Sequence, residues 1–217
     1  VKNLTLSVKI QKTTIVGGLI SITQGSACLI ENITVKGSVS GTVANVAGVV
    51  GNSKAATTIR NCKNYADITS SLASGFAFVG GILGSSNGAI VIDSCENYGT
   101  ITAKATMVGG IVGLPRKAAN SYVTGCKNFG NVTGSAQVGG IAGATRVKVE
   151  NSYCLEIALI NGNEAKTLTL YGIKTSVGGK VVTASVVGQI DDKTGNSDCG
   201  ELINCGLCDA KGVAITE

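Results

Sequence analysis

The sequence contains no histidine and no tryptophan, only one proline, and few charged residues. Without histidine, the chain cannot form a Ser-His-Asp or Cys-His nucleophile system or a histidine-ligated metal site. Charged residues make up 14% of the chain, against about 25% in typical globular proteins, while 44% of the residues are hydrophobic. This composition excludes a charge-rich disordered chain, which would bury too little apolar surface to fold.

The positive charge is small and is spread along the chain. The formal net charge is +5 and no run of five or six like charges is present, so we expect no nucleic-acid partner. The longest apolar runs fall well short of the ~18 residues that a membrane helix needs, so we expect no membrane span. The chain begins at Val1 without a signal-peptide pattern, which indicates either a mature product or an excerpt.

Glycine is abundant, with 31 residues, and many of these belong to an internal repeat. The string VGGIVG and its variants begin at Val16, Val46, Val79, Val108 and Val138. The spacings of 30, 33, 29 and 30 residues define about five units in residues 1–150. Residues 151–217, where the repeat is lost, form a second region, which we interpret as a non-repeat cap or assembly region. Within it, residues 166–173 and 180–188 still alternate like strands.

A second motif, of the form C-x-N-[YF]-x-x-[IV]-T, keeps the same phase as the glycine strings. Short β-branched runs separated by Gly, Asn and Ser are typical of strands and turns, and no helical apolar stripe is present in the repeats. A period near 30 residues with about three strand-like pieces predicts an all-β fold, a β-solenoid similar to a parallel β-helix. Equivalent residues then stack about 4.8 Å apart. A propeller is disfavoured because its blades need about 40 residues and carry aromatic signatures.

Stacking of the coils predicts columns of equivalent side chains. One interior column contains Leu4, Ile33, Cys62, Cys95 and Cys126. A second is expected to form an amide ladder at a corner, and it contains Asn64, Asn97 and Asn128. An aromatic column beside it contains Tyr65, Tyr98 and Phe129, and an inward column contains Ile68, Ile101 and Val132. We expect the paired glycines at bends, where glycine permits positive φ and close approach of backbones.

The alternation of VGGIVG-type strings with N-C-x-N-[YF]-G-x-[IV]-T-G resembles the GLUG-type repeats of secreted and surface-anchored microbial proteins. The resemblance covers about two thirds of the chain. Residues 149–155, VENSYCL, resemble the segment that often closes such arrays. The resemblance implies a repetitive extracellular or cell-surface module, and it carries over no catalytic residue.

Eight cysteines without any histidine favour disulfides over zinc. We expect two disulfides in the C-terminal cap, in an oxidising compartment, formed among Cys154, Cys199, Cys205 and Cys208. The alternative is a zinc site of these four thiolates, for which Cys205-x-x-Cys208 is a weak signal. In the column of Cys62, Cys95 and Cys126, stacked neighbours are close enough to bridge. We favour buried thiols there, because the same column holds aliphatic residues.

N-glycosylation sequons begin at Asn3, Asn32 and Asn131, a number that chance alone produces in this composition. We expect glycans at these positions if the source is eukaryotic.

At the N-terminus, the first residues already fit the repeat, so no cap precedes the first coil. Unpaired strand edges attract other chains. The explanations are a truncated chain, an upstream domain, or head-to-tail association into a filament.

The leading hypothesis is a non-catalytic extracellular structural or adhesive protein without a cofactor, which self-associates head to tail. The alternative is a carbohydrate-binding module that holds acidic polysaccharide, such as cell-surface glycans, on a basic strip made of Lys54, Arg116, Lys117 and Arg146. An ice-binding face of outward Ser and Thr residues is less favoured. A polysaccharide-degrading enzyme is also less favoured, because it needs clustered carboxylates. The 13 acids are scattered, apart from Asp191 and Asp192 in an expected loop.

Overall fold

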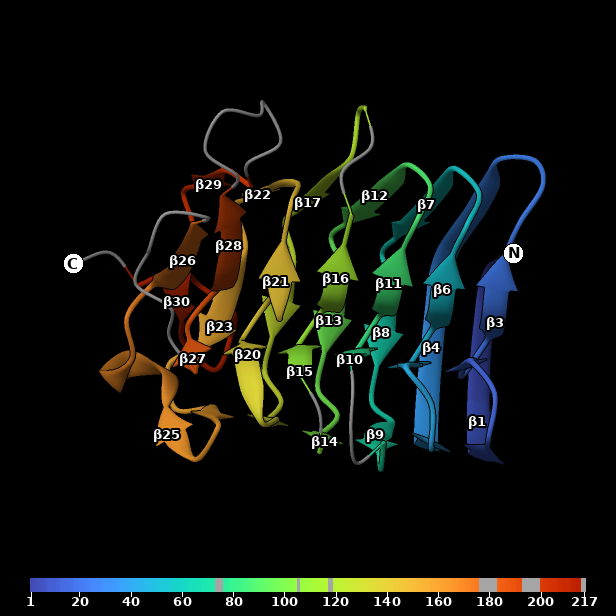
Figure 1. The fold of residues 1–217 in the computed structure, drawn as a ribbon, viewed down its shortest axis with the longest axis horizontal. Coiled ribbons are helices and arrows are strands. Elements are labelled where there is room, and N and C mark those ends of the chain that lie inside the picture. Colours follow the sequence, from blue (N-terminus) through green and yellow to red (C-terminus); the bar gives the residue numbers. More distant parts are fainter. Residues whose placement is uncertain (73–75, 105, 117–118, 176–182, 193–199, 216–217) are drawn as a thin grey trace.

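The chain folds as an all-β solenoid of about five coils, as the repeat predicts, and almost all of its strand pairs are parallel (Figure 1). The computed structural model describes residues 1–72, 76–104, 106–116, 119–175, 183–192 and 200–215. The coils stack along one axis, from the N-terminal coil at the right of Figure 1 to the C-terminal region at the left. Among the described residues, the one helical element is the short 3-10 helix η1 (Ala165–Thr167).

The largest sheet contains 17 strands, and each repeat coil contributes up to three short consecutive strands to it. Its strands are β1 (Lys2–Lys12), β4 (Cys28–Gly41), β7 (Thr57–Arg60), β8 (Lys63–Asn64), β9 (Asp67–Ser70), β12 (Ile90–Asp93), β13 (Glu96–Asn97), β14 (Ile101–Ala103), β17 (Tyr122–Thr124), β18 (Lys127–Asn128), β19 (Val132–Thr133), β22 (Lys148–Glu150), β23 (Tyr153–Leu155), β24 (Leu159–Ile160), β25 (Asn163–Glu164), β29 (Leu202–Ile203) and β30 (Gly206–Cys208).

Three smaller sheets complete the coils. The six-stranded sheet contains the glycine strings and consists of β2 (Val16–Gly17), β5 (Asn45–Ala47), β10 (Phe76–Gly80), β15 (Thr106–Gly109), β20 (Ala136–Gly139) and β27 (Ala184–Ser185). The four-stranded sheet consists of β3 (Ile20–Thr23), β6 (Val50–Ser53), β11 (Leu83–Ser86) and β16 (Val112–Pro115). The three-stranded sheet consists of β21 (Ala144–Thr145), β26 (Tyr171–Thr175) and β28 (Gly188–Asp192).

The register of the strands turns the sequence repeat into columns. In the pairing of β1 with β4, Leu4 lies beside Ile33. In the pairing of β7 with β12, Ile59 lies beside Ile92. Because successive side chains of a strand point to opposite faces, alternate columns point into the core. A side chain therefore meets its own counterpart from the next coil.

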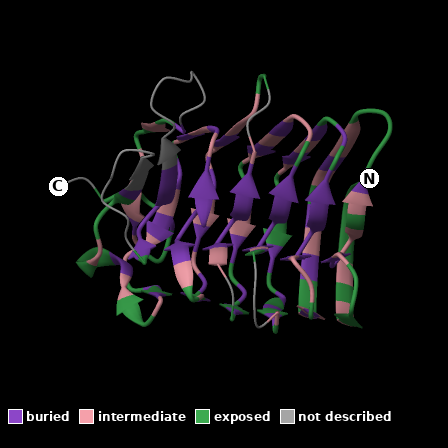
Figure 2. Ribbon diagram, in the orientation of Figure 1, coloured by how far each residue is buried: buried purple, intermediate pink, exposed green. Residues whose placement is uncertain are grey.

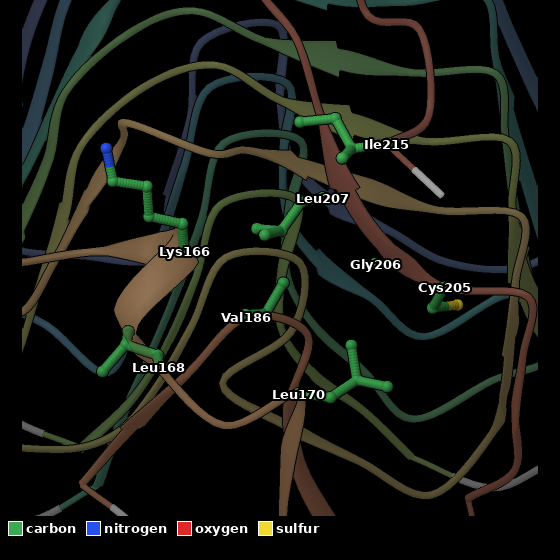
Figure 3. A pocket seen from close by; sticks show the side chains of 8 residues that line it. All are labelled: Lys166, Leu168, Leu170, Val186, Cys205, Gly206, Leu207 and Ile215. Atoms are coloured by element: carbon green, nitrogen blue, oxygen red, sulfur yellow. The ribbon is translucent and has the colours of Figure 1, made fainter. Parts of the chain in front are cut away.

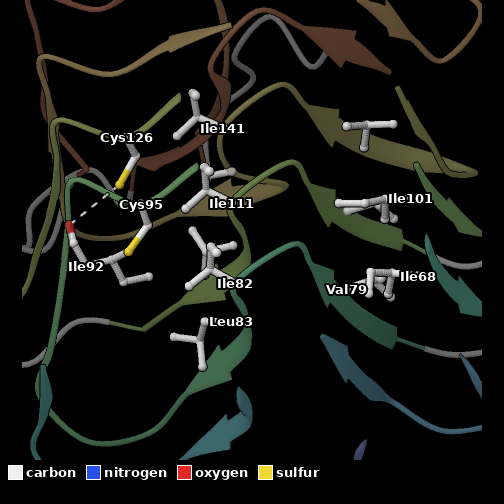
Figure 4. Packing of buried hydrophobic residues seen from close by; sticks show 14 of the residues in the cluster. Ile68, Val79, Ile82, Leu83, Ile92, Cys95, Ile101, Ile111, Cys126 and Ile141 are labelled. Carbon is white, nitrogen blue, oxygen red and sulfur yellow. Dashed lines mark hydrogen bonds between the residues drawn. The ribbon is translucent and has the colours of Figure 1, made fainter. Parts of the chain in front are cut away.

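The core runs through the stacked coils, which are largely purple in Figure 2, whereas β1 at the N-terminal end is exposed or half-buried. Its inward columns include Ile68, Ile101 and Val132, which are in register and fully buried. A further column of fully buried isoleucines lies near the cysteines in Figure 4 and contains Ile82, Ile111 and Ile141. Branched aliphatic side chains have few rotamers, which favours close packing at these repeated positions.

Strands after residue 150 add to the same sheets as the repeat coils. β23 pairs with β18, β27 with β20, and β28 with β21, all in parallel. The expected strand over residues 166–173 is wrong in its first part, where η1 forms, and β26 begins only at Tyr171. Asp191 and Asp192 lie in β28 rather than in a loop, because β28 pairs with β26 through its last residue. Of the expected strand at 180–188, residues 180–182 lie outside the described residues, and β27 covers Ala184–Ser185.

The two ends of the solenoid differ in how their strand edges are covered. Within the described part of the chain, β1 pairs only with β4, so one edge of this 11-residue strand is open. At the other end, antiparallel segments cover part of the last coils. β25 folds back on β24, and Ala214 forms an antiparallel bridge with Cys208.

Candidate functional site

Asn64, Asn97 and Asn128 form the asparagine ladder inside the solenoid, and all three side chains are fully buried. The Nδ2 of Asn64 donates to Oδ1 of Asn97, and the Nδ2 of Asn97 donates to Oδ1 of Asn128, each at 2.8 Å. Each Nδ2 also donates to the carbonyl oxygen two residues ahead, at 2.8 to 3.0 Å. The ladder therefore provides its buried amides with the partners that polar groups need inside a core.

The asparagine ladder explains the glycine pairs of the repeat. A Cβ on Gly81 would collide with the Asn97 amide and the Gly110 carbonyl, and one on Gly110 would collide with Asn128 and the Gly140 carbonyl. The expectation of positive φ at these glycines is wrong, because none of them has it. Glycine is needed there because the backbone of one coil lies directly against the amides and the next coil.

Positive φ occurs instead in a column that immediately precedes the cysteines, called here the corner column. Its members have φ between 49° and 62° and are Asn3, Asn32, Asn61, Ser94, Gly125, Asn151 and Asn204. Asparagine and glycine tolerate the left-handed region better than other residues. The residue before each motif cysteine therefore marks the corner of the coil. This signal is present in the repeat, but sequence reasoning missed it.

Two of the predicted glycosylation sites belong to the corner column. Asn3 and Asn32 are exposed, and the Nδ2 of Asn32 donates to Oδ1 of Asn3 at 2.8 Å. Asn131 is also exposed, and its Oδ1 accepts the backbone N–H of Leu159 at 2.9 Å. All three side chains thus lie at the surface and also hold neighbouring coils together. Glycosylation of these residues stays a prediction.

Cys62, Cys95 and Cys126 stack in one interior column, called here the cysteine column, as buried free thiols. Figure 4 shows two of them, Cys95 and Cys126. Each S–H donates to the carbonyl oxygen two residues earlier, at 3.2 to 3.3 Å. Ser152 follows Cys126 in this column, and its hydroxyl donates in the same way at 2.9 Å. Leu4 begins the column but is 37% exposed, because no described coil covers it.

The surroundings raise the pKa of several buried thiols. The neighbouring Cys95 thiol and burial raise the pKa of Cys62, and burial together with Cys126 raises the pKa of Cys95. Burial raises the pKa of Cys154 to about 12 and that of Cys208 to about 11. Because the thiolate is the reactive form, these side chains fit a packing role better than a catalytic or redox role.

The two disulfides expected in the C-terminal cap are absent from the described residues. The free thiols there are Cys154, Cys205 and Cys208. Cys199 lies outside the described residues. Stacking separates Cys205 from Cys154, because Cys205 extends the cysteine column beyond Ser152, whereas Cys154 extends the asparagine ladder. The Nδ2 of Asn128 donates to the Cys154 sulfur at 3.7 Å, so this thiol serves as the last acceptor of the ladder.

On the outer surface, Tyr65, Tyr98 and Phe129 form the aromatic stack. Successive ring centroids are 4.6 and 4.7 Å apart, with interplanar angles of 4° and 7°. Beside the stack, the Lys63 ammonium lies 2.7 Å from Glu96, and the Tyr98 hydroxyl donates to Glu96 at 2.8 Å. Both faces of the Tyr98 ring are covered by its neighbours, so an open ring face can exist only at an end of the stack.

The Lys63–Glu96 pair has a defined electrostatic effect. Burial acts to raise the pKa of Glu96, but hydrogen bonds from Lys63 and Tyr98 outweigh it and hold that pKa below its usual value. The hydrogen bond to Glu96 raises the pKa of Lys63. Both groups are therefore charged at neutral pH, and the ammonium keeps further N–H donors that point away from Glu96.

Next to Tyr65, at the N-terminal end of the aromatic stack, lies an open hollow of about 700 Å³. It is lined by Thr5, Thr34, Lys36, Lys63 and Tyr65. The space exists because Thr5 and Thr34 hold the places that Lys63 and Glu96 take in later coils. Its volume lies within the range of ~300–1,000 Å³ typical of ligand sites. Sequence reasoning placed Tyr65 in a stack but missed the hollow, because Thr5, Thr34 and Lys36 lie in earlier coils and no motif joins them to Tyr65.

The predicted basic strip is less open than its sequence suggests. Lys54 is exposed, whereas Arg116 and Arg146 are half-buried. The Arg116 guanidinium lies 5.8 Å from the centroid of the Phe78 ring. Lys117 lies outside the described residues. The strip is therefore a poor candidate for holding an extended acidic chain.

The outward threonines considered for ice binding are exposed and in register, and they are Thr69, Thr102 and Thr133.

At the C-terminal end of the core lies an apolar pocket of about 340 Å³ (Figure 3). Its lining residues are Lys166, Leu168, Leu170, Val186, Cys205, Gly206, Leu207 and Ile215. The one charged group among them, the Lys166 ammonium, lies 2.9 Å from the Glu164 carboxylate. Most of the lining side chains are aliphatic, and Leu168, Cys205 and Leu207 pack against the core of the solenoid.

Among the described residues, no group of three or more His, Cys, Asp or Glu side chains is placed to hold a metal ion. No helix in the described part of the chain is long and apolar enough to cross a membrane.

No protein-family model, curated protein or solved structure matches this chain, so the resemblance to GLUG-type repeats rests on the motifs alone.

Proposed function

We propose that this protein is a non-catalytic structural or adhesive β-solenoid of the cell exterior, whose copies associate head to tail. The observation that carries the proposal is that β1 pairs with β4 along one edge, and that no strand of the described residues pairs with its other edge. An unpaired strand edge presents a row of N–H and C=O groups that another strand can satisfy. The resemblance to GLUG-type repeats supports the extracellular location.

Apolar surface at both ends of the core supports association between copies. At the N-terminal end, Val1 is 56% exposed and Leu4 is 37% exposed. At the C-terminal end, the apolar pocket beside Leu207 and Ile215 leaves aliphatic side chains uncovered. Contact between unlike ends removes both surfaces from water, and burial of apolar area contributes roughly 25 cal/mol per Å².

The charges of the two ends are opposite, which favours head-to-tail over head-to-head contact. The first coil carries Lys9 and Lys12, and its Lys2 is paired with Glu31 of the next coil. The described residues after residue 150 contain six acidic residues and three lysines. Opposite potentials attract unlike ends, and like potentials disfavour contact between two N-terminal ends. A contact between unlike ends leaves one free end on each copy, and it extends into a filament unless the rotation closes a ring.

Electron microscopy and analytical ultracentrifugation of the purified chain test the proposal. We expect filaments or rings at low ionic strength and shorter species at high salt, since salt screens the attraction between exposed charges. Reversing the charge at the N-terminal end, with Lys9→Glu and Lys12→Glu, should abolish assembly. Lys54→Glu, on a side face, is the matched control and should leave assembly intact. Dispersed monomers of the unsubstituted chain at every concentration and ionic strength would contradict the proposal.

A further inference from the structure

The hollow beside Tyr65 combines three kinds of group that recognise sugars. The first is an aromatic surface, because Tyr65 is 43% exposed and ends the aromatic stack. One face of its ring lies on Tyr98 at 4.6 Å, so the other face is directed toward the preceding coil. Among the described residues, no cation lies over this ring. An aromatic face of this kind accepts the C–H-rich face of a pyranose ring.

The second kind of group is cationic. Lys36 lies in the coil before Tyr65, between the paired positions Val35–Asn64 and Ser38–Asp67, and it is exposed. Within the described part of the chain, no acidic side chain forms an ion pair with Lys36. Lys63 is held in place by Glu96 and retains further donors. With one acid and two ammonium groups, the local charge is positive, which favours a ligand with a carboxylate.

The third kind of group is the pair of hydroxyls on Thr5 and Thr34, which line the hollow. Each hydroxyl can donate and accept, as sugar hydroxyls do. Single-stranded nucleic acid is a poorer match, because it needs several open ring faces on which successive bases stack. The aromatic stack offers no such series, since Tyr65 and Phe129 cover both faces of Tyr98.

We propose that Tyr65, Lys36, Lys63, Thr5 and Thr34 form a binding site for one acidic sugar residue, a pyranose that carries a carboxylate. The sugar ring lies on the open face of Tyr65, its carboxylate lies near Lys36 and Lys63, and its hydroxyls face the two threonines. This inference goes beyond head-to-tail assembly, because a single copy contains the whole site. It also places the site on a different surface from the basic strip that contains Lys54.

NMR titration of isotopically labelled protein tests the site with three probes, which are trigalacturonate, 3′-sialyllactose and lactose. We expect one or both acidic probes to shift the signals of Lys36 and Tyr65, and the sugar C–H protons to move upfield under the ring current. Lactose, which lacks a carboxylate, should bind more weakly. The two acidic probes distinguish a uronate from a sialic acid. Higher salt should weaken acidic binding.

Four variants divide the site into its parts. Tyr65→Ala should weaken the binding of the acidic probe by about fivefold, whereas Tyr65→Phe, which keeps the ring face and the stack, should retain it. Lys36→Gln should weaken it by about threefold and leave lactose unaffected. Lys54→Gln is the matched lysine control and should have no effect.

Three results would overturn the inference. They are the absence of shifts at Lys36 and Tyr65 with both acidic probes at millimolar concentration, equal binding of lactose, and an equal loss of binding in the Lys54 and Lys36 variants. The titration is read on the monomeric species, because a single copy contains the whole site, so loss of binding there and failure of filament assembly are separate outcomes.

Discussion

Asn97→Asp tests the asparagine ladder at its centre. The change keeps the shape of the side chain but replaces its amide nitrogen by oxygen. In the native chain, the fully buried Nδ2 of Asn97 donates to the Gly99 carbonyl at 3.0 Å and to Asn128 at 2.8 Å. A carboxylate only accepts hydrogen bonds. Both donated bonds are therefore lost, and two acceptor oxygens face a buried negative charge.

The expected cost follows from these two bonds. Each lost hydrogen bond removes about 1 kcal/mol, and a buried acceptor left without its donor costs roughly 1–3 kcal/mol. We expect the free energy of unfolding to fall by about 4 kcal/mol at neutral pH. For a chain of this size, that loss lowers Tm by about 8–16 °C.

The loss of stability caused by Asn97→Asp should also depend on pH. Burial without a cation raises the pKa of the introduced carboxyl in the folded chain above its unfolded value of about 3.9. Below that value the group is protonated in both states, and it regains one O–H donor. The destabilisation is therefore smallest in acid, grows as the pH rises through the unfolded pKa, and levels off above the folded pKa.

Urea denaturation of the native chain and the variant, at matched pH values from acidic to neutral, measures both effects. Asn87→Asp is the control, because it makes the same chemical change at an exposed residue and should alter stability by less than about 0.5 kcal/mol. If Asn97→Asp is no more destabilising than Asn87→Asp, or if its deficit does not vary with pH, the described role of the ladder is refuted.

Three further predictions follow from the packing and the charges. Gly110→Ala should lower the free energy of unfolding by about 3 kcal/mol, because its Cβ would collide with the next coil. Gly206→Ala is the control, because open space surrounds Gly206, and it should leave the free energy of unfolding unchanged. Thermal denaturation measures both variants, and an equal loss of stability in the two would contradict this reasoning. Cys95 should not react with iodoacetamide until the chain unfolds, because its thiol is buried. Mass spectrometry of alkylated peptides measures the reaction, and rapid alkylation of Cys95 in the folded chain would contradict its burial. The lowered pKa of Glu96 stabilises the fold above the ordinary value of 4.5, and this contribution is lost as the pH falls through the lower folded pKa. Glu96→Gln should therefore flatten the acidic limb of the plot of Tm against pH, and an unchanged limb would argue against the pair.

The repeat made much of the core predictable, because parallel stacking at a fixed period brings equivalent residues together. The column of Asn64, Asn97 and Asn128 could be expected as a ladder for that reason, and its hydrogen bonds are present. The inward position of Ile68, Ile101 and Val132 follows from the two-residue alternation of a strand.

Where the period fails, local pattern was a poor guide. The alternation of residues 166–173 predicts a strand, yet η1 occupies Ala165–Thr167. The cysteine count predicts disulfides, yet Cys154 and Cys205 lie in different columns as free thiols. Both outcomes depend on which strand of an earlier coil each residue meets, and composition does not contain that information.

The candidate sugar site depends even more on the tertiary structure. Thr5, Lys36 and Tyr65 are separated by about one repeat each, and no motif links them. They line one hollow only because three successive coils align in register, with threonines in the first two coils, Lys36 in the second and an aromatic ring in the third.

The sequence by itself determined the architecture, since a repeat of about 30 residues rich in β-branched residues and glycine has one favourable way to bury its apolar face, as stacked coils. It also determined which residues share a column, because the period sets the register. Only the tertiary structure decided which residues adopt positive φ at the corners and at which residue the aromatic stack ends. It also showed that the glycine pairs are needed for the close approach of neighbouring coils. Those features depend on contacts between neighbouring coils, where a backbone meets an amide or a ring face has no neighbour.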